Sequence, residues 1–96
     1  MVANRLLRQE RDAILGLARK HGATNVRVFG SAANDEFGPS SDIDFLVDLE
    51  PDATLIDLGA LLVALEELLQ RKVDVVTSAA LHRAIRDDIL KQAVPL

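Results

Sequence analysis

Residues 26–47 of this chain read VRVFGSAANDEFGPSSDIDFLV, and this stretch decides the fold. A short apolar run ends at Gly30 and Ser31, and after ten intervening residues Asp42 and Asp44 open a second apolar run. Because side chains alternate between the two faces of a strand, both carboxylates are expected on the same face. Carboxylates held that close repel each other unless a proton or a cation lies between them. The stretch therefore predicts a strand that keeps an acidic pair for a cation.

The residues at the end of the first run complete this chemistry. Gly30 and Ser31 lie where a strand ends and a short helix could begin, so they offer backbone N–H groups and a hydroxyl to a phosphate. A divalent cation held by carboxylates commonly binds substrate phosphates as well. An EF-hand is excluded because residues 45–47 are apolar where that loop needs polar ligands. A Walker P-loop is excluded because no Gly-Lys-Ser/Thr follows the first strand. The pattern indicates nucleotide chemistry.

These motifs resemble the nucleotidyltransferase superfamily typified by DNA polymerase beta. Its signature is Gly-Ser, a spacer of about this length, Asp-x-Asp on the next strand and a third acid on a later strand. Within it, the chain looks most like the minimal nucleotidyltransferase (MNT) family, whose members are antitoxins of HEPN-domain toxins. The resemblance extends over essentially the whole chain and includes the segments SDIDFLV at 41–47, VDVV at 73–76 and AVPL at 93–96.

The resemblance implies a role for each matching residue. Asp42 and Asp44 would be shared ligands of two Mg²⁺ (or Mn²⁺) ions, about 3.5–4 Å apart. Asp74 would bind only the catalytic ion and help to deprotonate the attacking hydroxyl. Gly30 and Ser31 would hold the β- and γ-phosphates of ATP, so that together with Asp42 and Asp44 they form the nucleotide site. The plainer alternatives are an exposed acidic strand edge for Asp42 and Asp44, and simple surface for Asp74.

The function implied by the resemblance is that of a protein adenylyltransferase. It would transfer AMP from ATP to a hydroxyl, a tyrosine by analogy, on a HEPN toxin, with which it would form a hetero-oligomer. One departure favours a rival, a decayed antitoxin that acts by binding alone. Asn34 stands where the family has an arginine, and Arg27, Lys72 or a partner's arginine are candidates to replace that charge. A small-molecule nucleotidyltransferase is disfavoured because 96 residues leave no room for an acceptor domain.

Composition limits the other classes of function. The chain has 96 residues, 49% of them hydrophobic, which predicts one domain over 1–96 with a single core. A net charge of −4 and only three aromatic residues, all Phe, argue against direct binding of nucleic acid. No cysteine is present, and no apolar run is long enough to cross a membrane. We therefore expect a cytoplasmic protein without a signal peptide or a membrane partner.

The periodicity of apolar residues predicts an α/β (α+β) fold: a small mixed sheet of three to four strands packed with helices. The first two strands should be antiparallel because a short segment joins them, and the second and third parallel through a right-handed crossover. The predicted order is a helix over 4–21, a strand over 26–29, a strand over 43–49, a helix over 55–70, a strand over 73–77 and a last helix over about 81–93.

Two segments are candidates for docking a partner. The helix over 55–70 is apolar well beyond one stripe, and the tail Val94-Pro95-Leu96 is apolar as well. The alternative for the helix is that both of its sides are buried within a small core.

Overall fold

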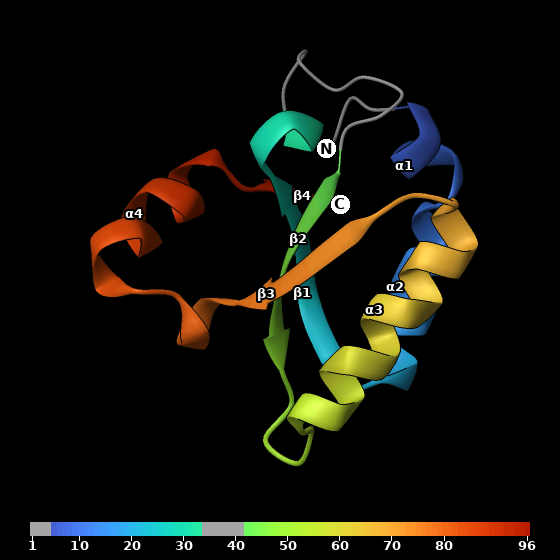
Figure 1. The fold of residues 1–96 in the computed structure, drawn as a ribbon, viewed down its shortest axis with the longest axis horizontal. Helices are drawn as coiled ribbons and strands as arrows, with labels where there is room; N and C mark the ends of the chain where they lie inside the picture. The colour runs from blue at the N-terminus through green and yellow to red at the C-terminus, as the bar shows by residue number, and fades with distance from the viewer. Residues whose placement is uncertain (1–4, 34–41) are drawn as a thin grey trace.

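The computed structural model describes residues 5–33 and 42–96 of the protein (Figure 1). Helices and strands alternate along the chain as the sequence predicts. In chain order they are α1 (Arg5–Gln9), α2 (Arg11–Lys20), β1 (Ala23–Phe29), the 3₁₀ turn η1 (Gly30–Ala33), β2 (Ile43–Leu49), α3 (Leu55–Leu69), β3 (Val73–Thr77), the 3₁₀ turn η2 (Ser78–Ala80), α4 (Arg83–Gln92) and β4 (Val94–Pro95).

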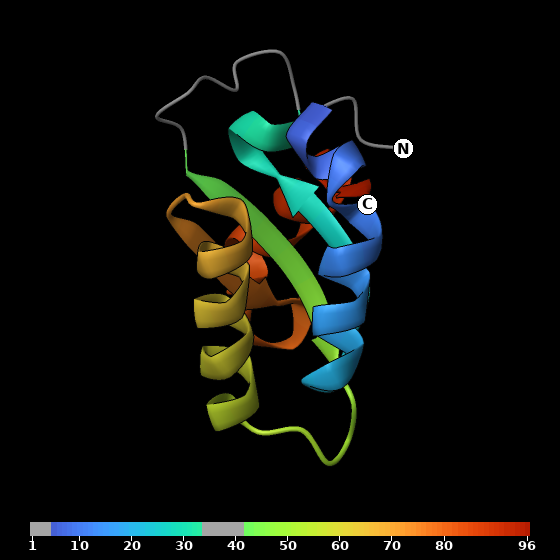
Figure 2. The same cartoon turned by 90° about the vertical axis from the view of Figure 1, so that its right-hand side faces the viewer.

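The strands form one mixed sheet in the order β3-β2-β1-β4. β1 runs antiparallel to β2 and to β4, whereas β2 and β3 are parallel and joined through α3. Both predicted strand relationships are confirmed, and the fourth strand is the tail. Figure 2 shows α2 and α3 beside each other against one face of this sheet.

The core lies between the sheet and the pair α2 and α3. Alternate residues of β2 enter it, and Ile43, Phe45 and Val47 are almost fully buried. Leu61, Leu65 and Leu69 of α3 pack from the other side, four residues apart along one stripe. The alternation leaves the even-numbered residues of β2 on the opposite face of the sheet.

The predicted helix over 4–21 is two helices. The break falls at Glu10, after which α2 begins, and buried Leu7 and Ile14 hold the two pieces on the same core. The start of α3 is as predicted, because Thr54 and Asp57 form a reciprocal capping box in which each side chain accepts a hydrogen bond from the other's backbone N–H.

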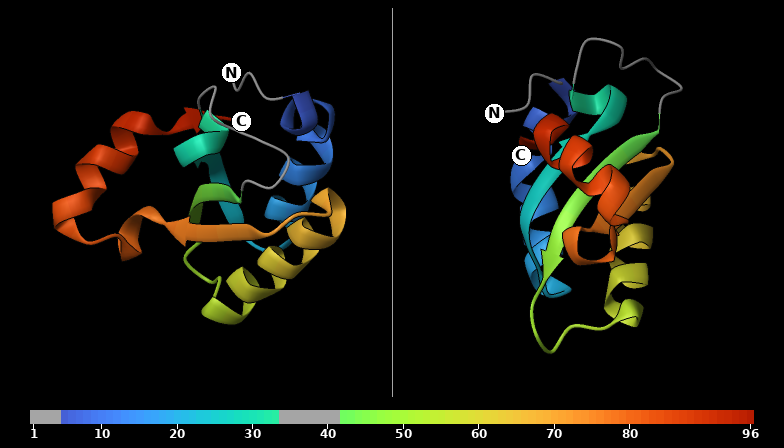
Figure 3. Two further views of the ribbon diagram at one scale, coloured as in Figure 1. Left: turned by 45° about the horizontal axis from the view of Figure 1, so that its top comes forward. Right: turned by 90° about the vertical axis from the view of Figure 1, so that its left-hand side faces the viewer.

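Two C-terminal elements have positions that the sequence analysis did not specify. α4 lies on the opposite face of the sheet from α2 and α3, as Figures 1 and 3 show, and none of its residues is buried. The tail forms β4, and Leu96 is buried and donates its backbone N–H to the carbonyl of Val26 at 3.1 Å. The tail is therefore part of the sheet, and Leu96, one of the three residues offered as a candidate docking surface, is committed to the core. Within the described ranges, no helix has the length and apolar character needed to cross a membrane.

Candidate active site

The turn after β1 places Gly30 directly against Asp44. Gly30 has φ +67°, a backbone conformation that favours glycine, and it opens η1. A β-carbon on residue 30 would lie 2.7 Å from Oδ2 of Asp44, closer than atoms can approach without displacement. Ala32, which is buried, anchors η1 in the core, and Ser31 beside it is half-buried. The predicted glycine-serine turn and one predicted carboxylate are thus neighbours in space.

The three predicted acids lie on the same side of the sheet. Asp42 immediately precedes β2, and Asp44 is paired with Asp74 in the parallel register of β2 and β3. Residues next to them in sequence, such as Ile43 and Val75, belong to the core. Asp42 and Asp74 are exposed, whereas Asp44 is half-buried.

The three acids influence one another electrostatically. Burial raises the pKa of Asp44 above its ordinary value, and the negative charges of Asp74 and Asp42 raise it further. None of the other described residues forms an ion pair with Asp44. The carboxylate is therefore held where its charge is unfavourable, and a bound cation would relieve that cost.

The acids suit a hard cation in kind but do not converge on one point. Carboxylate oxygens are the ligands that Mg²⁺ takes together with substrate phosphates and water. In the described part of the chain, no three Asp, Glu, His or Cys side chains come close enough together to hold a metal ion. Asp42, Asp44 and Asp74 thus supply a suitable donor set, and the remaining ligands would have to come from a nucleotide and from water.

At the other end of β2, the carboxylate of Asp48 is stabilised by hydrogen bonds. Asp48 accepts hydrogen bonds from Asn25 Nδ2 at 3.0 Å, from Arg27 Nη2 at 3.2 Å and from the hydroxyl of Ser78. These bonds, with Ser78 the largest contributor, lower the pKa of Asp48 below its ordinary value. Arg27 is thus engaged with Asp48, which weakens its candidacy as the cation that replaces the missing family arginine.

The Asp48 cluster was missed from the sequence. A register shift in β1 between Thr24 and Arg27, with Asn25 at φ +50°, brings Asn25 and Arg27 to the same carboxylate. Strict alternation does not reveal such an irregularity. Of the other residues considered for phosphate binding, Lys72 is exposed just before β3, and Asn34 lies outside the described residues.

Comparison with known proteins places the chain in a family. The profile of the nucleotidyltransferase domain matches residues 11–96. This protein belongs to the nucleotidyltransferase family. A candidate protein adenylyltransferase of Methanocaldococcus jannaschii is 41% identical over 81 residues, which cover 84% of this chain and 87% of that one. The protein adenylyltransferase MntA of Thermococcus cleftensis is 35% identical over 78 residues, covering 81% and 79%.

Solved structures agree with this placement. The structure of a candidate minimal nucleotidyltransferase superposes with a TM-score of 0.86 at 44% identity, covering 98% of both chains. A toxin–antitoxin crystal structure determined with AMP-PNP matches with a TM-score of 0.75 at 22% identity, covering 88% of this chain and 69% of that one. The first identifies the nucleotidyltransferase as a minimal one, and the second shows the shared fold. The predicted family, fold class and enzyme class are confirmed.

Proposed function

We propose that this nucleotidyltransferase transfers AMP from ATP to a hydroxyl, a tyrosine, on a partner HEPN toxin and thereby acts as its antitoxin. The reaction depends on Mg²⁺, and residues 1–96 form a single domain that completes its acceptor site with the partner. Support comes from the relatives named protein adenylyltransferases and from the fold shared with the toxin–antitoxin structure.

The observation that carries the proposal is the charge of Asp44, which none of the other described residues compensates. Its carboxylate lies against the backbone of Gly30, is paired in register with Asp74, and has a raised pKa. A half-buried acid beside two further acids destabilises the free protein, and such perturbed groups are typical of functional sites. The turn at Gly30 and Ser31, which we assign to phosphate binding, is in contact with that acid. Nucleotide transfer requires such a phosphate-binding turn next to a cation-binding carboxylate.

Each residue has a defined role in the proposed reaction. Gly30 and Ser31 hold the β- and γ-phosphates, which orients the α-phosphorus towards the acceptor. Asp42 and Asp44 would hold both Mg²⁺ ions and Asp74 one of them, and the ions supply the positive charge that offsets the triphosphate. The acceptor oxygen bonds to the α-phosphorus as the bond to the bridging oxygen breaks. Pyrophosphate leaves, and Asp74 helps to take the hydroxyl proton.

The second candidate is an antitoxin that neutralises by binding alone. Two observations favour it: Asn34 replaces the arginine usual in the family, and the described acids do not converge on one point. Exposed apolar side chains on α3 and α4 offer docking surfaces that need no chemistry. They are Leu55, Ile56, Val63, Ile85 and Leu90.

The two candidates differ in whether the partner carries added mass. The toxin is co-expressed with wild-type protein or with Asp42→Asn/Asp44→Asn and then analysed by intact-protein mass spectrometry. With wild type we expect an increase of one or more AMP units on a hydroxyl side chain. With the double variant we expect at least a ~1000-fold loss of transfer, because the cation site that offsets the triphosphate is removed.

A matched control distinguishes the loss of two negative charges in general from their loss at positions 42 and 44. Asp52→Asn/Glu67→Gln removes the same two negative charges from exposed positions elsewhere, so transfer should stay at the wild-type level. If the Asp42→Asn/Asp44→Asn variant protects cells fully and the toxin gains no mass even with wild type, the binding-only antitoxin is correct.

A further inference from the structure

One side of β3 has no neighbouring strand, because β3 is the last strand in the order β3-β2-β1-β4. Figure 1 shows its ribbon in front of β2 and β1, with no described element crossing before it. The Ile43 N–H donates to the carbonyl of Lys72 at 3.1 Å, so Lys72 and every second residue after it direct their backbone groups to β2. Since these groups alternate along a strand, those of Val73, Val75 and Thr77 point to the open side.

Most of this open side lacks hydrogen-bond partners. At its start, Oε2 of Glu66 in α3 accepts a hydrogen bond from the Val73 N–H at 3.1 Å. Further along, none of the described residues bonds to either backbone group of Val75 or to the N–H of Thr77. A row of unpaired backbone groups at a sheet edge is a template for another strand. From Val75 onward, β3 can therefore pair with an added strand.

An apolar strip of α3 flanks the same edge. The bond from Glu66 places its side of the helix against the edge, and Leu62, Gly59 and Leu55 lie on that side at intervals of three and four residues. We call these three residues the α3 shelf. Leu62 is half-buried and Leu55 is 80% exposed, and a β-carbon at Gly59 would meet nothing within 4 Å. The shelf thus leaves room for an apolar side chain next to the edge.

The other face of an added strand would lie beside the proposed active site. In an antiparallel pair, the β-carbons of directly opposite residues are about 4.5–5.5 Å apart on the same face. A residue opposite Asp74 would therefore lie beside its exposed carboxylate, which is in register with Asp44. Alternate residues of the added strand would face the α3 shelf instead, because side chains alternate between the two faces.

We infer that the open edge of β3 binds an extended segment of the partner toxin in antiparallel orientation. The residue with the acceptor hydroxyl lies opposite Asp74, and its apolar neighbour lies on the α3 shelf. This inference rests on the proposed function and specifies how the acceptor reaches the site. Backbone hydrogen bonds supply affinity in such strand addition, and the side-chain positions supply specificity. A second copy of this chain fits less well, because each copy carries a net charge of −4 and places Asp74 at this edge.

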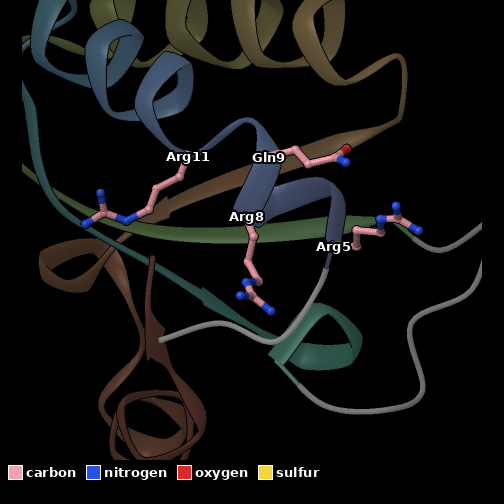
Figure 4. Close-up of a pocket in the computed structure, with 4 residues that line it drawn as sticks. All are labelled: Arg5, Arg8, Gln9 and Arg11. Atoms are coloured by element: carbon pink, nitrogen blue, oxygen red, sulfur yellow. The ribbon is translucent and has the colours of Figure 1, made fainter.

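The arginines of α1 and α2 offer no comparable site for a partner. Figure 4 shows the side chains of Arg5, Arg8 and Arg11 extending in different directions, so they share no point at which one anionic group would contact all three. The edge of β3 differs because its donors and acceptors are already aligned by the sheet.

The test follows the exchange of single amide protons by NMR, in the labelled protein alone and in its complex with purified, unlabelled toxin. The N–H groups of Val75 and Thr77 should exchange rapidly in the free protein and at least about tenfold more slowly in the complex. The N–H of Val76 faces β2, so it should exchange slowly in both states and serves as the internal reference. Unchanged exchange at Val75 and Thr77, or failure of the toxin to bind, would overturn the inference. Protection that appears in the protein alone and grows with its concentration would assign the edge to a second copy and overturn it as well.

A pair of glycine variants tests the α3 shelf. Gly59→Glu places a charged side chain on the shelf and should weaken the affinity for the toxin by roughly tenfold or more, measured by calorimetry. Gly16→Glu is the matched control, because Gly16 is also an exposed glycine within a helix, α2, with open space around it. Both variants should melt no lower than wild type, since glutamate favours a helix more than glycine does. Equal loss of affinity in the two variants would show an effect of charge alone and contradict the assigned shelf.

Both measurements detect binding and not transfer, so the two proposals can fail separately. Protected amides in a toxin that gains no AMP would leave the docking edge standing and remove the proposed reaction. Transfer of AMP with unprotected amides would do the reverse.

Discussion

Asp44 and Asp48 lie on the same strand and the same face, four residues apart, in opposite electrostatic situations. Asp48 is surrounded by donors from Asn25, Arg27 and Ser78, and its pKa is lowered. Asp44 faces burial and two further negative charges, and its pKa is raised. Among the described residues, Asp48 at one end of β2 thus has hydrogen-bond donors, whereas Asp44 at the other end has none.

The difference shows that this fold can surround a carboxylate with hydrogen-bond donors where that carboxylate has a structural role. A register shift in β1 and a 3₁₀ turn after β3 supply every donor that Asp48 needs. No comparable donors are aimed at Asp44 from the described residues. A partly buried charge normally has a partner within the protein. A charge without one is expected at a functional site, where the bound ligand becomes the partner. Each prediction below acts at one end of β2 or on a residue beside it, and the first two use a residue at the other end as their reference.

Among the single substitutions, the largest effect is expected from Asp74→Asn. If Asp74 assists the attacking hydroxyl, transfer should fall at least about 100-fold, while ATP binding stays near wild type. Label transfer from α-labelled ATP to the co-purified toxin measures the first quantity, and calorimetry the second. Asp48→Asn is the reference and should keep most of its transfer activity. Near-normal transfer by Asp74→Asn would remove this residue from the reaction.

A β-carbon at Gly30 should damage both fold and site. Alanine at φ +67° costs about 1–2 kcal/mol, and its β-carbon would also push Asp44 aside. Gly22→Ala is the matched control, because Gly22 has φ +74° and a comparably close contact, with Ala53 at 2.9 Å, at the other end of β2. Urea unfolding should show a loss for both variants, and nucleotide affinity should fall for Gly30→Ala alone. Equal affinity losses would contradict the placement of the site.

Asp48→Asn should destabilise the protein by about 1 kcal/mol. Charge-assisted bonds are lost and Arg27, whose side chain is only 12% exposed, loses its ionic partner, although the 43% exposure of Asp48 moderates the effect. Because the folded pKa is lowered, this stabilisation is present above the ordinary pKa of 3.8 and disappears as the pH falls through the folded value. Thermal unfolding at pH 7 and at pH 3 measures the change, which should be smaller at pH 3.

The smallest effect has the opposite sign. Asp44→Asn should raise the melting temperature of the free protein by at most a few degrees at pH 7, because it removes an unfavourable charge. The folded pKa is raised, so the cost of this charge develops as the pH rises above the ordinary value of 3.8 and is complete above the folded pKa. Melting curves without metal or nucleotide should therefore separate at pH 7 and coincide near pH 3. A lower melting temperature at pH 7 would show that Asp44 is a structural acid like Asp48.

Much of this architecture follows from local sequence patterns. The strand over 43–49 and the strand over 73–77 have the predicted bounds, because β-branched and apolar runs end at polar turns. The alternation of side chains along a strand is enough to predict that Asp42 and Asp44 share one face and that Asp74 lies on the face opposite to Val73 and Val75. The capping pair Thr54 and Asp57 fixed the start of α3.

What the sequence did not reveal depends on tertiary contacts. The break at Glu10 leaves the helical pattern almost uninterrupted, and the pairing of the tail with β1 joins residues far apart in the chain. Ser78 and Asn25 look like ordinary turn residues until the sheet brings them to Asp48. The roles assigned to Asp42, Asp44 and Asp74 remain predictions that the variants above test.

The place of β4 has a consequence for how the protein is made. β4 completes the exposed edge of β1, and the side chain of Leu96 fills the core, so both come from the end of the chain described here. Ribosomes deliver these residues after β1, β2 and β3 have already emerged. During synthesis the nascent domain must therefore wait with an unpaired strand edge, a surface that favours aggregation.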